Sequence, residues 1–276
     1  MREPSAEEYT GENAPQLTPE LAIAQLQSPD LSLRYYAAWW LGKYRVSQPE
    51  AVEALIAALE DEEDKTELGG YPLRRNAARA LGKLGNLKAV PGLIQCLECE
   101  DFYVREAAAQ SLAMLGDKSA TPALIKLLEG GVAGAVQVPG RPHLVQPYEA
   151  VIEALGAIGA IEAISLIQPF LDHPLPRVQC STARAMYQLT QDSFYGEKLV
   201  KMLATADLKM RRVVLGDLGA IGYLPSAEAI AYAQVENGFK LLALKGLLEY
   251  QLPDELDTQD ISPEAVRVMN LMDALL

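Results

Sequence analysis

The chain repeats short stretches in which apolar residues recur every three or four positions, the spacing that places them on one face of an α-helix. The clearest stretch reads Arg-x-x-Ala-Ala-x-x-Leu-Gly. Its copies, from clear to degenerate, begin at Arg34, Arg74, Arg105, Tyr148, Gln179, Arg211 and near Lys240. They are spaced about 31 to 43 residues apart, a period typical of solenoids built from stacked helix pairs.

Each copy also carries residues suited to the ends and contacts of a helix. Asp30, Asp101 and Asp207 precede their arginines by four residues, where an aspartate can accept a hydrogen bond from the first free N–H groups. The alanine pair is expected to let paired helices approach closely. The glycine after the leucine, as at Gly42 and Gly82, is expected to close the helix. Between the copies we predict first helices over 49–60, 89–97, 121–128 and 163–171.

The pattern resembles HEAT-type repeats over most of residues 18–250. Because one such repeat cannot bury its apolar face alone, stacking of the repeats is the fold. We therefore predict an all-α protein, a right-handed α-α superhelix of about six HEAT-like repeats. Residues 1–17 are predicted to form a flexible tail, and residues 18–276 a single solenoid with a C-terminal cap. Insertions interrupt it at 61–72 and 130–147.

Composition narrows the classes of function. The chain has 24 Lys and Arg residues against 37 Asp and Glu residues, a net charge of −13. Binding to phosphate backbones needs concentrated positive charge, so we expect no nucleic-acid binding. Neither a signal peptide nor a run of roughly 18 apolar residues is evident, so we expect no membrane insertion. Three cysteines, an odd count, favour a reducing compartment, and we predict a cytoplasmic protein.

Four aromatic residues of the first copy are not repeated in the later ones: Tyr35, Tyr36, Trp39 and Trp40. On a helical wheel they lie more than about 100° from the centre of the face that the repeated residues define. They therefore cannot fill the space between the two helices of their own repeat. An exposed apolar patch of this size usually marks an interface.

The corresponding positions of the second copy hold Arg75, Asn76 and Arg79. We expect an aromatic patch beside a pair of arginines on one surface. Such a surface suits a flat conjugated ligand with carboxylates, because rings stack on the π-system and guanidinium groups bind carboxylates bidentately. Alternatively, the aromatic residues are buried against the N-terminal segment or a partner chain, and one surface could serve both purposes.

The acidic run over residues 60–64 lies next to this surface in the sequence. Runs of this kind are usually solvated loops. The alternative is that one of its carboxyl groups donates a proton, with Asp61 and Asp64 as the candidates.

The remaining candidate residues give weaker signals. Cys96 and Cys99 lack a second pair or spaced histidines, so we expect packing residues rather than a zinc site. Cys180 occupies the position of Arg75 in its own repeat and is expected to face away from the core. His143 and His173 are expected in surface turns, and no metal site is predicted. Because the chain has no catalytic triad or phosphate-binding glycine loop, any electrophile must arrive with the substrate.

Two blocks of the sequence resemble a known family. They are Tyr-Tyr-Ala-Ala-Trp-Trp at 35–40 and Gly-Gly-Tyr-Pro-Leu-Arg-Arg-Asn at 69–76. On these blocks, and over nearly its whole length, the chain resembles the E subunits of the heterodimeric phycocyanobilin lyases. The resemblance implies an enzyme that acts with a smaller F-type subunit. Together they attach phycocyanobilin to a cysteine of the phycocyanin α subunit through a thioether, and detachment or transfer of the bilin between acceptors is also expected.

The implied substrate fits the surface described above. Phycocyanobilin is an open-chain tetrapyrrole, flat in segments, with two propionates. The nucleophile is the acceptor's thiol and the electrophile is the bilin's ethylidene carbon, so we expect no tightly bound cofactor. The candidate proton donors remain Asp61 and Asp64. The expected bilin-binding residues are Tyr35, Tyr36, Trp39, Trp40, Tyr71, Arg75, Asn76 and Arg79.

A second function fits the same fold. The chain could be a non-catalytic HEAT-repeat bilin chaperone, or a scaffold for assembly or disassembly of the phycobilisome. Either would produce no thioether.

Overall fold

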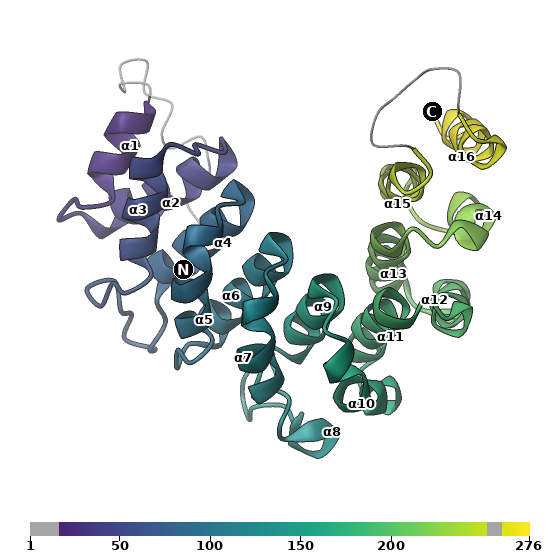
Figure 1. Cartoon of the computed structure of the whole chain (residues 1–276), viewed down its shortest axis with the longest axis horizontal. Coiled ribbons are helices and arrows are strands. Elements are labelled where there is room, and N and C mark those ends of the chain that lie inside the picture. Colours follow the sequence, from purple (N-terminus) through teal and green to yellow (C-terminus); the bar gives the residue numbers. More distant parts are fainter. Residues whose placement is uncertain (1–16, 253–260) are drawn as a thin grey trace.

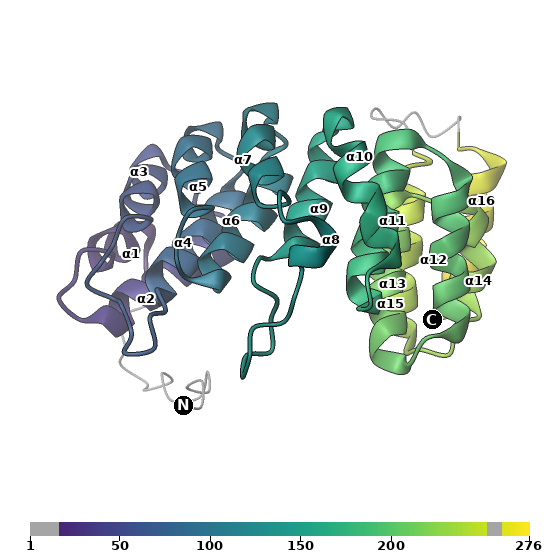
Figure 2. The same ribbon diagram turned by 90° about the horizontal axis from the view of Figure 1, so that it is seen from below.

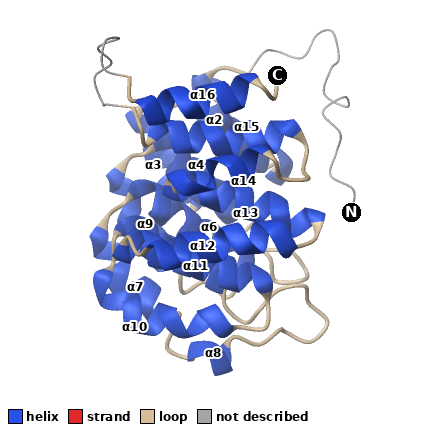
Figure 3. Cartoon of the chain, turned by 90° about the vertical axis from the view of Figure 1, so that its right-hand side faces the viewer, coloured by secondary structure: helices blue, strands red, loops and turns tan. Residues whose placement is uncertain are grey.

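The computed structural model describes residues 17–252 and 261–276, which form a curved stack of helix pairs (Figure 1). Within these ranges there are sixteen α-helices and no β-strand, only an isolated bridge between Gln137 and Leu144 (Figure 3). The predicted all-α solenoid is confirmed. Of the predicted tail, all but Leu17 lies outside the described residues. In the described ranges, no helix is both long and apolar enough to cross a membrane.

The helices lie in two layers, and each pair gives one helix to each layer (Figure 1). The inner, concave layer comprises α2 (Leu31–Lys43), α4 (Pro72–Leu84), α6 (Phe102–Leu115), α9 (Tyr148–Ile158), α11 (Pro176–Thr190), α13 (Leu208–Ile221) and α15 (Asn237–Glu249). The outer layer comprises α1 (Pro19–Gln25), α3 (Pro49–Ala58), α5 (Val90–Cys96), α7 (Thr121–Lys126), α10 (Ile164–Ile167), α12 (Ser193–Thr205) and α14 (Ala227–Ala231). The short α8 (Gly131–Gly134) belongs to the second insertion, and α16 (Pro263–Asp273) packs on α14 and α15.

The aspartates that precede the repeated arginines cap inner helices, as predicted. Asp30, Asp101 and Asp207 each accept a hydrogen bond of 2.8 Å from a backbone N–H two or three residues further on. Each thereby gives a partner to one of the N–H groups that a helix start leaves unsatisfied.

The repeated arginine ties its inner helix to the end of the preceding outer helix. Arg34 donates from Nε to the Leu26 carbonyl at 3.0 Å, and Arg105 donates to the Cys99 carbonyl at 2.6 Å. Arg74 makes the equivalent bond, at 2.6 Å, just beyond α3. Leu26 is the C-cap of α1, whereas Cys99 and Asp61 lie in the turns just beyond α5 and α3. In each repeat the arginine supplies a partner for a carbonyl where the outer helix ends, which is a physical reason for its recurrence.

The glycine after the repeated leucine does not close its helix, so that prediction is wrong. Gly82 lies inside α4, and the left-handed cap is Gly85, with φ of 71°. Gly82 instead faces the neighbouring inner helix, where an added Cβ would lie 2.5 Å from Ser111 Oγ. At Gly156 an added Cβ would lie 2.6 Å from the Cα of Ala185. These glycines are kept small because successive inner helices touch there.

The two insertions leave the solenoid along the same edge, where outer helices lead into inner ones (Figure 2). The first forms turns over residues 61–71 before α4 begins. The second passes through α8 and the Gln137–Leu144 bridge before α9 begins.

The second insertion is held at two points. Arg105 of α6 donates to the Val145 carbonyl at 3.0 Å. The ring of His173, which precedes α11, bonds through Nε2 to the Ala135 carbonyl at 3.0 Å. His173 is buried, at 3% exposure, so its predicted place in a surface turn is wrong. Its ring anchors the insertion from the following repeat.

We predict that Gly82→Ala lowers the free energy of unfolding by about 1–3 kcal/mol, the usual cost of overpacking a tight contact. The added methyl group would meet both the side chain and the backbone of Ser111. Thermal or urea unfolding of the purified chain measures the loss.

Gly216→Ala in α13 is the matched control, because a Cβ there meets no atom within 4 Å. That change should leave stability equal or raise it by up to about 1 kcal/mol, the difference in helix propensity. Equal losses for both variants would contradict the assigned role of Gly82.

Candidate functional site

Two of the four aromatic side chains of α2 are exposed to solvent, as the helical wheel indicates, and the other two are not. Tyr36 and Trp39 are 37% and 40% exposed, whereas Tyr35 and Trp40 are half-buried, and Trp40 also packs against the core. The rings of Tyr36 and Trp39 lie 5.4 Å apart, and Lys43 Nζ lies 4.6 Å from the Trp39 ring centroid. We call these four aromatic residues the aromatic surface. Two of its members, Tyr36 and Trp39, are exposed to solvent.

Arg75 and Arg79 lie on α4, the inner helix that packs directly against α2. Arg79 is exposed and Arg75 is half-buried, with its Nε buried and without a hydrogen-bond partner. Within the described ranges, neither guanidinium group takes part in an ion pair. The structure thus brings the aromatic surface and two uncommitted arginines onto neighbouring inner helices.

Two other predicted bilin-binding residues lie elsewhere. Asn76 is buried, at 5% exposure, and its amide donates to the Tyr35 carbonyl at 3.3 Å. Tyr71 is also buried, and its hydroxyl lies 3.0 Å from a carboxylate oxygen of Glu100. The guanidinium of Arg74 covers the Tyr71 ring at 4.2 Å. Asn76 thus ties α4 to α2, and Tyr71 forms the interior of the first insertion.

The two predicted proton donors hold the first insertion in place. Asp61 pairs with Arg34 and accepts a hydrogen bond of 3.0 Å from the N–H of Asp64. Asp64 accepts a hydrogen bond from the N–H of Leu73 in the first turn of α4. Burial raises the pKa of the Asp64 carboxyl group. Both carboxylates have structural partners, and their role as acids stays a prediction.

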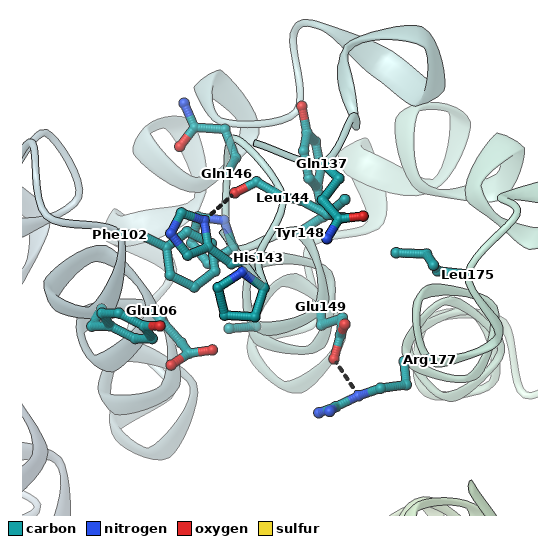
Figure 4. Close-up of a pocket in the computed structure, with 14 residues that line it drawn as sticks. Phe102, Glu106, Gln137, His143, Leu144, Gln146, Tyr148, Glu149, Leu175 and Arg177 are labelled. Carbon is teal, nitrogen blue, oxygen red and sulfur yellow. Dashed lines mark hydrogen bonds and ion pairs between the residues drawn. The ribbon is translucent and has the colours of Figure 1, made fainter. Parts of the chain in front are cut away.

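A pocket that the sequence analysis did not identify lies under the second insertion, between α6, α9 and α11 (Figure 4). Its cavity volume is about 290 Å³. His143 stacks on Phe102 with ring centroids 4.1 Å apart and planes inclined by 13°. The Nδ1–H of His143 donates to the Leu144 carbonyl at 2.8 Å. Gln137 and Tyr148 also line the pocket.

Two carboxyl groups and an arginine face this pocket: Glu106, Glu149 and Arg177. Burial raises the pKa of Glu106 and that of Glu149. Glu149 accepts an ion-paired hydrogen bond from Arg177 at 3.0 Å, whereas Glu106 has no ion pair or hydrogen bond from its side chain within the described ranges. Perturbed carboxyl groups in a cleft are typical of functional sites.

A further charged cluster continues along the inner layer. Arg184 of α11 lies between Glu153 of α9, at 3.5 Å, and Asp217 of α13, at 3.3 Å. Ser181 donates to the other carboxylate oxygen of Glu153 at 2.5 Å. Asp217 is 4% exposed, and burial, followed by the negative charge of Glu153, raises its pKa to about 7. Charges of alternating sign therefore follow one another across the inner helices.

The sequence does carry a signal for this arrangement. The residue directly after the repeated arginine is Tyr35, Arg75, Glu106 and Glu149 in successive inner helices. Comparing this repeat position across the copies would have placed the two acidic residues, Glu106 and Glu149, next to Arg75 on the same surface.

Asp217→Asn should change how stability depends on pH. Folding raises the pKa of Asp217 to about 7, so the wild-type chain loses stability as the pH rises from the unfolded value of about 4 through about 7. The asparagine variant has no such proton to lose. Urea unfolding at about pH 5.5 and pH 8.5 gives the free energy of unfolding of both proteins. The value for the variant, relative to that of the wild type, should be higher at pH 8.5 than at pH 5.5. If this relative value is the same at both pH values, the raised pKa of Asp217 is contradicted.

The three cysteines differ in burial. Cys96 is buried and Cys99 is partly buried against the core, which agrees with packing roles. Cys180 was expected to face away from the core, and this is wrong: it is fully buried, 3.7 Å from the sulfur of Met202. Burial raises the pKa of Cys180, which keeps the thiol protonated. In the described part of the chain, no group of three or more His, Cys, Asp or Glu residues could hold a metal ion.

Comparisons with known proteins agree with this architecture. A family model for HEAT repeats matches residues 71–137, and one for the PBS lyase HEAT-like repeat matches residues 33–61 and 147–173. The phycocyanobilin lyase subunit alpha of Nostoc sp. (strain PCC 7120 / SAG 25.82 / UTEX 2576) is 77% identical over 276 residues, all of both chains. That of Microchaete diplosiphon is 62% identical, over 95% of this chain and 90% of the relative.

A more distant relative and a solved structure extend the comparison. The bilin biosynthesis protein PecE of the same Nostoc strain is 48% identical, over 86% of this chain and 89% of PecE. The complex of CpcE and CpcF of phycocyanin lyase from Nostoc sp. PCC7120 contains a chain with 76% identity and a TM-score of 0.90. The match covers 99% of this chain and 100% of that one.

Proposed function

Since the chain belongs to the family of phycocyanobilin lyase alpha subunits, we propose that it attaches phycocyanobilin to a cysteine of the phycocyanin α subunit. The product is a thioether, and the same site can detach the bilin or transfer it between acceptors. The observation that carries this proposal is the 77% identity over the whole of both chains.

The chain acts as one half of a heterodimer with an F-type subunit. The solved relative, at 76% identity, was determined as a complex of CpcE with CpcF, which supports this pairing. The phycocyanin α subunit is the acceptor, and it supplies the cysteine thiol.

The bilin lies along the inner layer. Its conjugated rings contact Tyr36 and Trp39, whose side chains are the most exposed of the aromatic surface. Its two propionates bind Arg75 and Arg79, which have no carboxylate partner in the described ranges. A guanidinium group can hold a carboxylate through two parallel hydrogen bonds, which fixes both position and direction.

The contribution of the protein to catalysis is mainly positional. The acceptor supplies the nucleophile and the ethylidene group of the bilin is the electrophile, so no resident cofactor is required. Holding both in contact replaces a bimolecular encounter, and effective molarities of about 10⁵ M or more are known for well-oriented groups. The same positioning selects one cysteine and one face of the bilin.

A reducing cytoplasm suits the three unpaired cysteines of the chain.

Reconstitution tests the proposal. The chain, its F-type subunit, phycocyanobilin and the apo-phycocyanin α subunit are mixed, and the acceptor is denatured in acid. Chromophore that stays on the acceptor, with the absorption of a thioether-linked bilin, is the expected result. No product above the level without the chain would refute the proposal. Bilin binding without attachment would indicate a chaperone instead.

Arg79→Ala should weaken bilin binding to the heterodimer by about 10- to 100-fold, because a hydrogen bond to a charged group contributes about 1.5–3 kcal/mol. Titration of bilin absorption measures the dissociation constant. Lys88→Ala is the control, since it removes an exposed cation next to the outer helix α5. Equal affinities for both variants would contradict the assigned propionate site.

Trp39→Ala should weaken bilin binding while leaving the stability of the chain nearly unchanged. The ring is 40% exposed, so its removal leaves no buried cavity. Calorimetric melting of the chain and bilin titration of the heterodimer measure the two effects. A large loss of melting temperature with intact bilin affinity would identify Trp39 as a structural residue.

A further inference from the structure

We propose that Glu106 is the general acid of the attachment reaction, donating the proton that the bilin gains when the thiol adds. This inference rests on the proposed function. It names a catalytic residue for that reaction and adds the pocket under the second insertion to the bilin site.

The position of Glu106 connects the arginines to the pocket. Glu106 lies on α6, which packs directly against α4, the helix of Arg75 and Arg79. Neighbouring packed helices lie about 8–10 Å apart, a distance that a tetrapyrrole can span. Figure 4 shows Glu106 on one side of the pocket and the Glu149–Arg177 pair on the other, with His143 above.

Glu106 differs from the neighbouring carboxyl groups in having no partner. Glu149 is paired with Arg177, and the carboxylate of Glu153 with Ser181 and Arg184. Within the described ranges, the side chain of Glu106 has no hydrogen bond or ion pair. Arg177 holds one carboxylate oxygen of Glu149 and so fixes that side chain at the wall of the pocket. Glu106 is therefore the pocket carboxyl whose side chain can turn to meet a ligand.

The electrostatic surroundings agree with this role. Burial is the largest influence on Glu106 and raises its pKa, although Arg79, Arg177, Arg75 and His143 act in the opposite direction. Glu149 faces it across the pocket, and besides burial the charge of Glu106 contributes to the raised pKa of Glu149. The carboxyl group thus keeps its proton to a higher pH than a solvated glutamate does, which suits a general acid.

In this reaction Glu106 gives one proton to the bilin, and the acceptor's thiol releases one proton. The thiol adds across the ethylidene double bond, so the sulfur bonds to the outer carbon and the π electrons move to the ring carbon. Glu106 gives that ring carbon its proton, and the thiol proton passes to water. Water then reprotonates Glu106. Nothing is oxidised or reduced.

The geometry of the ligand fits both contacts. The propionates of a bilin project from the two central rings, whereas the ethylidene group is on a terminal ring. With the propionates on Arg75 and Arg79 of α4, a terminal ring reaches α6 and the pocket. Phe102 and the stacked His143 supply a flat wall there, 4.1 Å between centroids, against which such a ring can pack.

Glu106→Gln in the heterodimer tests the inference, with Glu162→Gln, an exposed surface change, as the matched control. The glutamine keeps the shape and hydrogen-bonding capacity of the side chain but has no acidic proton. We expect attachment to slow by about 10²-fold or more, the usual contribution of a general acid, with bilin affinity within about threefold of wild type. The control should match wild type in both.

The dependence on pH gives a second readout that a structural role would not change. The ratio of wild-type to Glu106→Gln rates should fall as the pH rises, because only the wild type loses its acid. Glu106→Asp retains an acid and should recover at least about tenfold of the lost rate. If the Glu106→Gln chain does not assemble with the F-type subunit, the pH dependence of the Glu106→Asp rate is measured instead.

Three results would overturn the inference: a glutamine variant with the wild-type rate, a rate loss matched by an equal loss of bilin affinity, or a rate ratio that does not change with pH. If the wild-type heterodimer itself makes no thioether, the proposed function fails rather than the role of Glu106.

Discussion

The contact between successive inner helices is the constraint on which the rest of this structure depends. Gly82 and Gly156 have room for no side chain, because Ser111 and Ala185 of the next helix occupy that space. Backbones that approach so closely keep the inner helices side by side. Residues at equivalent repeat positions therefore become neighbours in space. The concave surface is a direct result of this packing, and its chemistry is set by one or two residues of each inner helix.

On that surface, several charges are neutralised within the protein. Arg184 lies between Glu153 and the buried Asp217, and the exposed Arg177 pairs with Glu149. Burying a charge such as that of Asp217 is costly without a good partner. Within the described ranges, Arg75 and Arg79 on α4 and Glu106 on α6, in the N-terminal half, have no ion pair. Unsatisfied charge is thus concentrated where a ligand with both carboxylates and basic nitrogens would supply the missing partners.

Much of the fold was predictable because each repeat carries the residues that begin a helix and pack it against its neighbour. The helix-capping aspartates and the repeated arginine pattern predicted the helix pairs and their order. The absence of the aromatic residues from later copies indicated an exposed face of α2. The role of Gly82 was missed because a glycine near a helix end indicates a cap, and only the neighbouring helix reveals the contact. The pocket was missed because Glu106 and His143 are far apart in the sequence and are brought together by the insertion. Cys180 and His173 were misplaced because burial between repeats depends on neighbours that a helical wheel of one helix does not include.

The two anchors of the second insertion give the pocket a mechanical property. Arg105 holds the Val145 carbonyl from α6, and His173 holds the Ala135 carbonyl from the repeat that contains α11. The insertion is thereby attached to two different repeats on either side of the pocket. A change in curvature between these repeats would move the two attachment points relative to each other and change the width of the pocket. A subunit that docks elsewhere on the stack and alters the curvature between these repeats would thus act on the pocket without touching it.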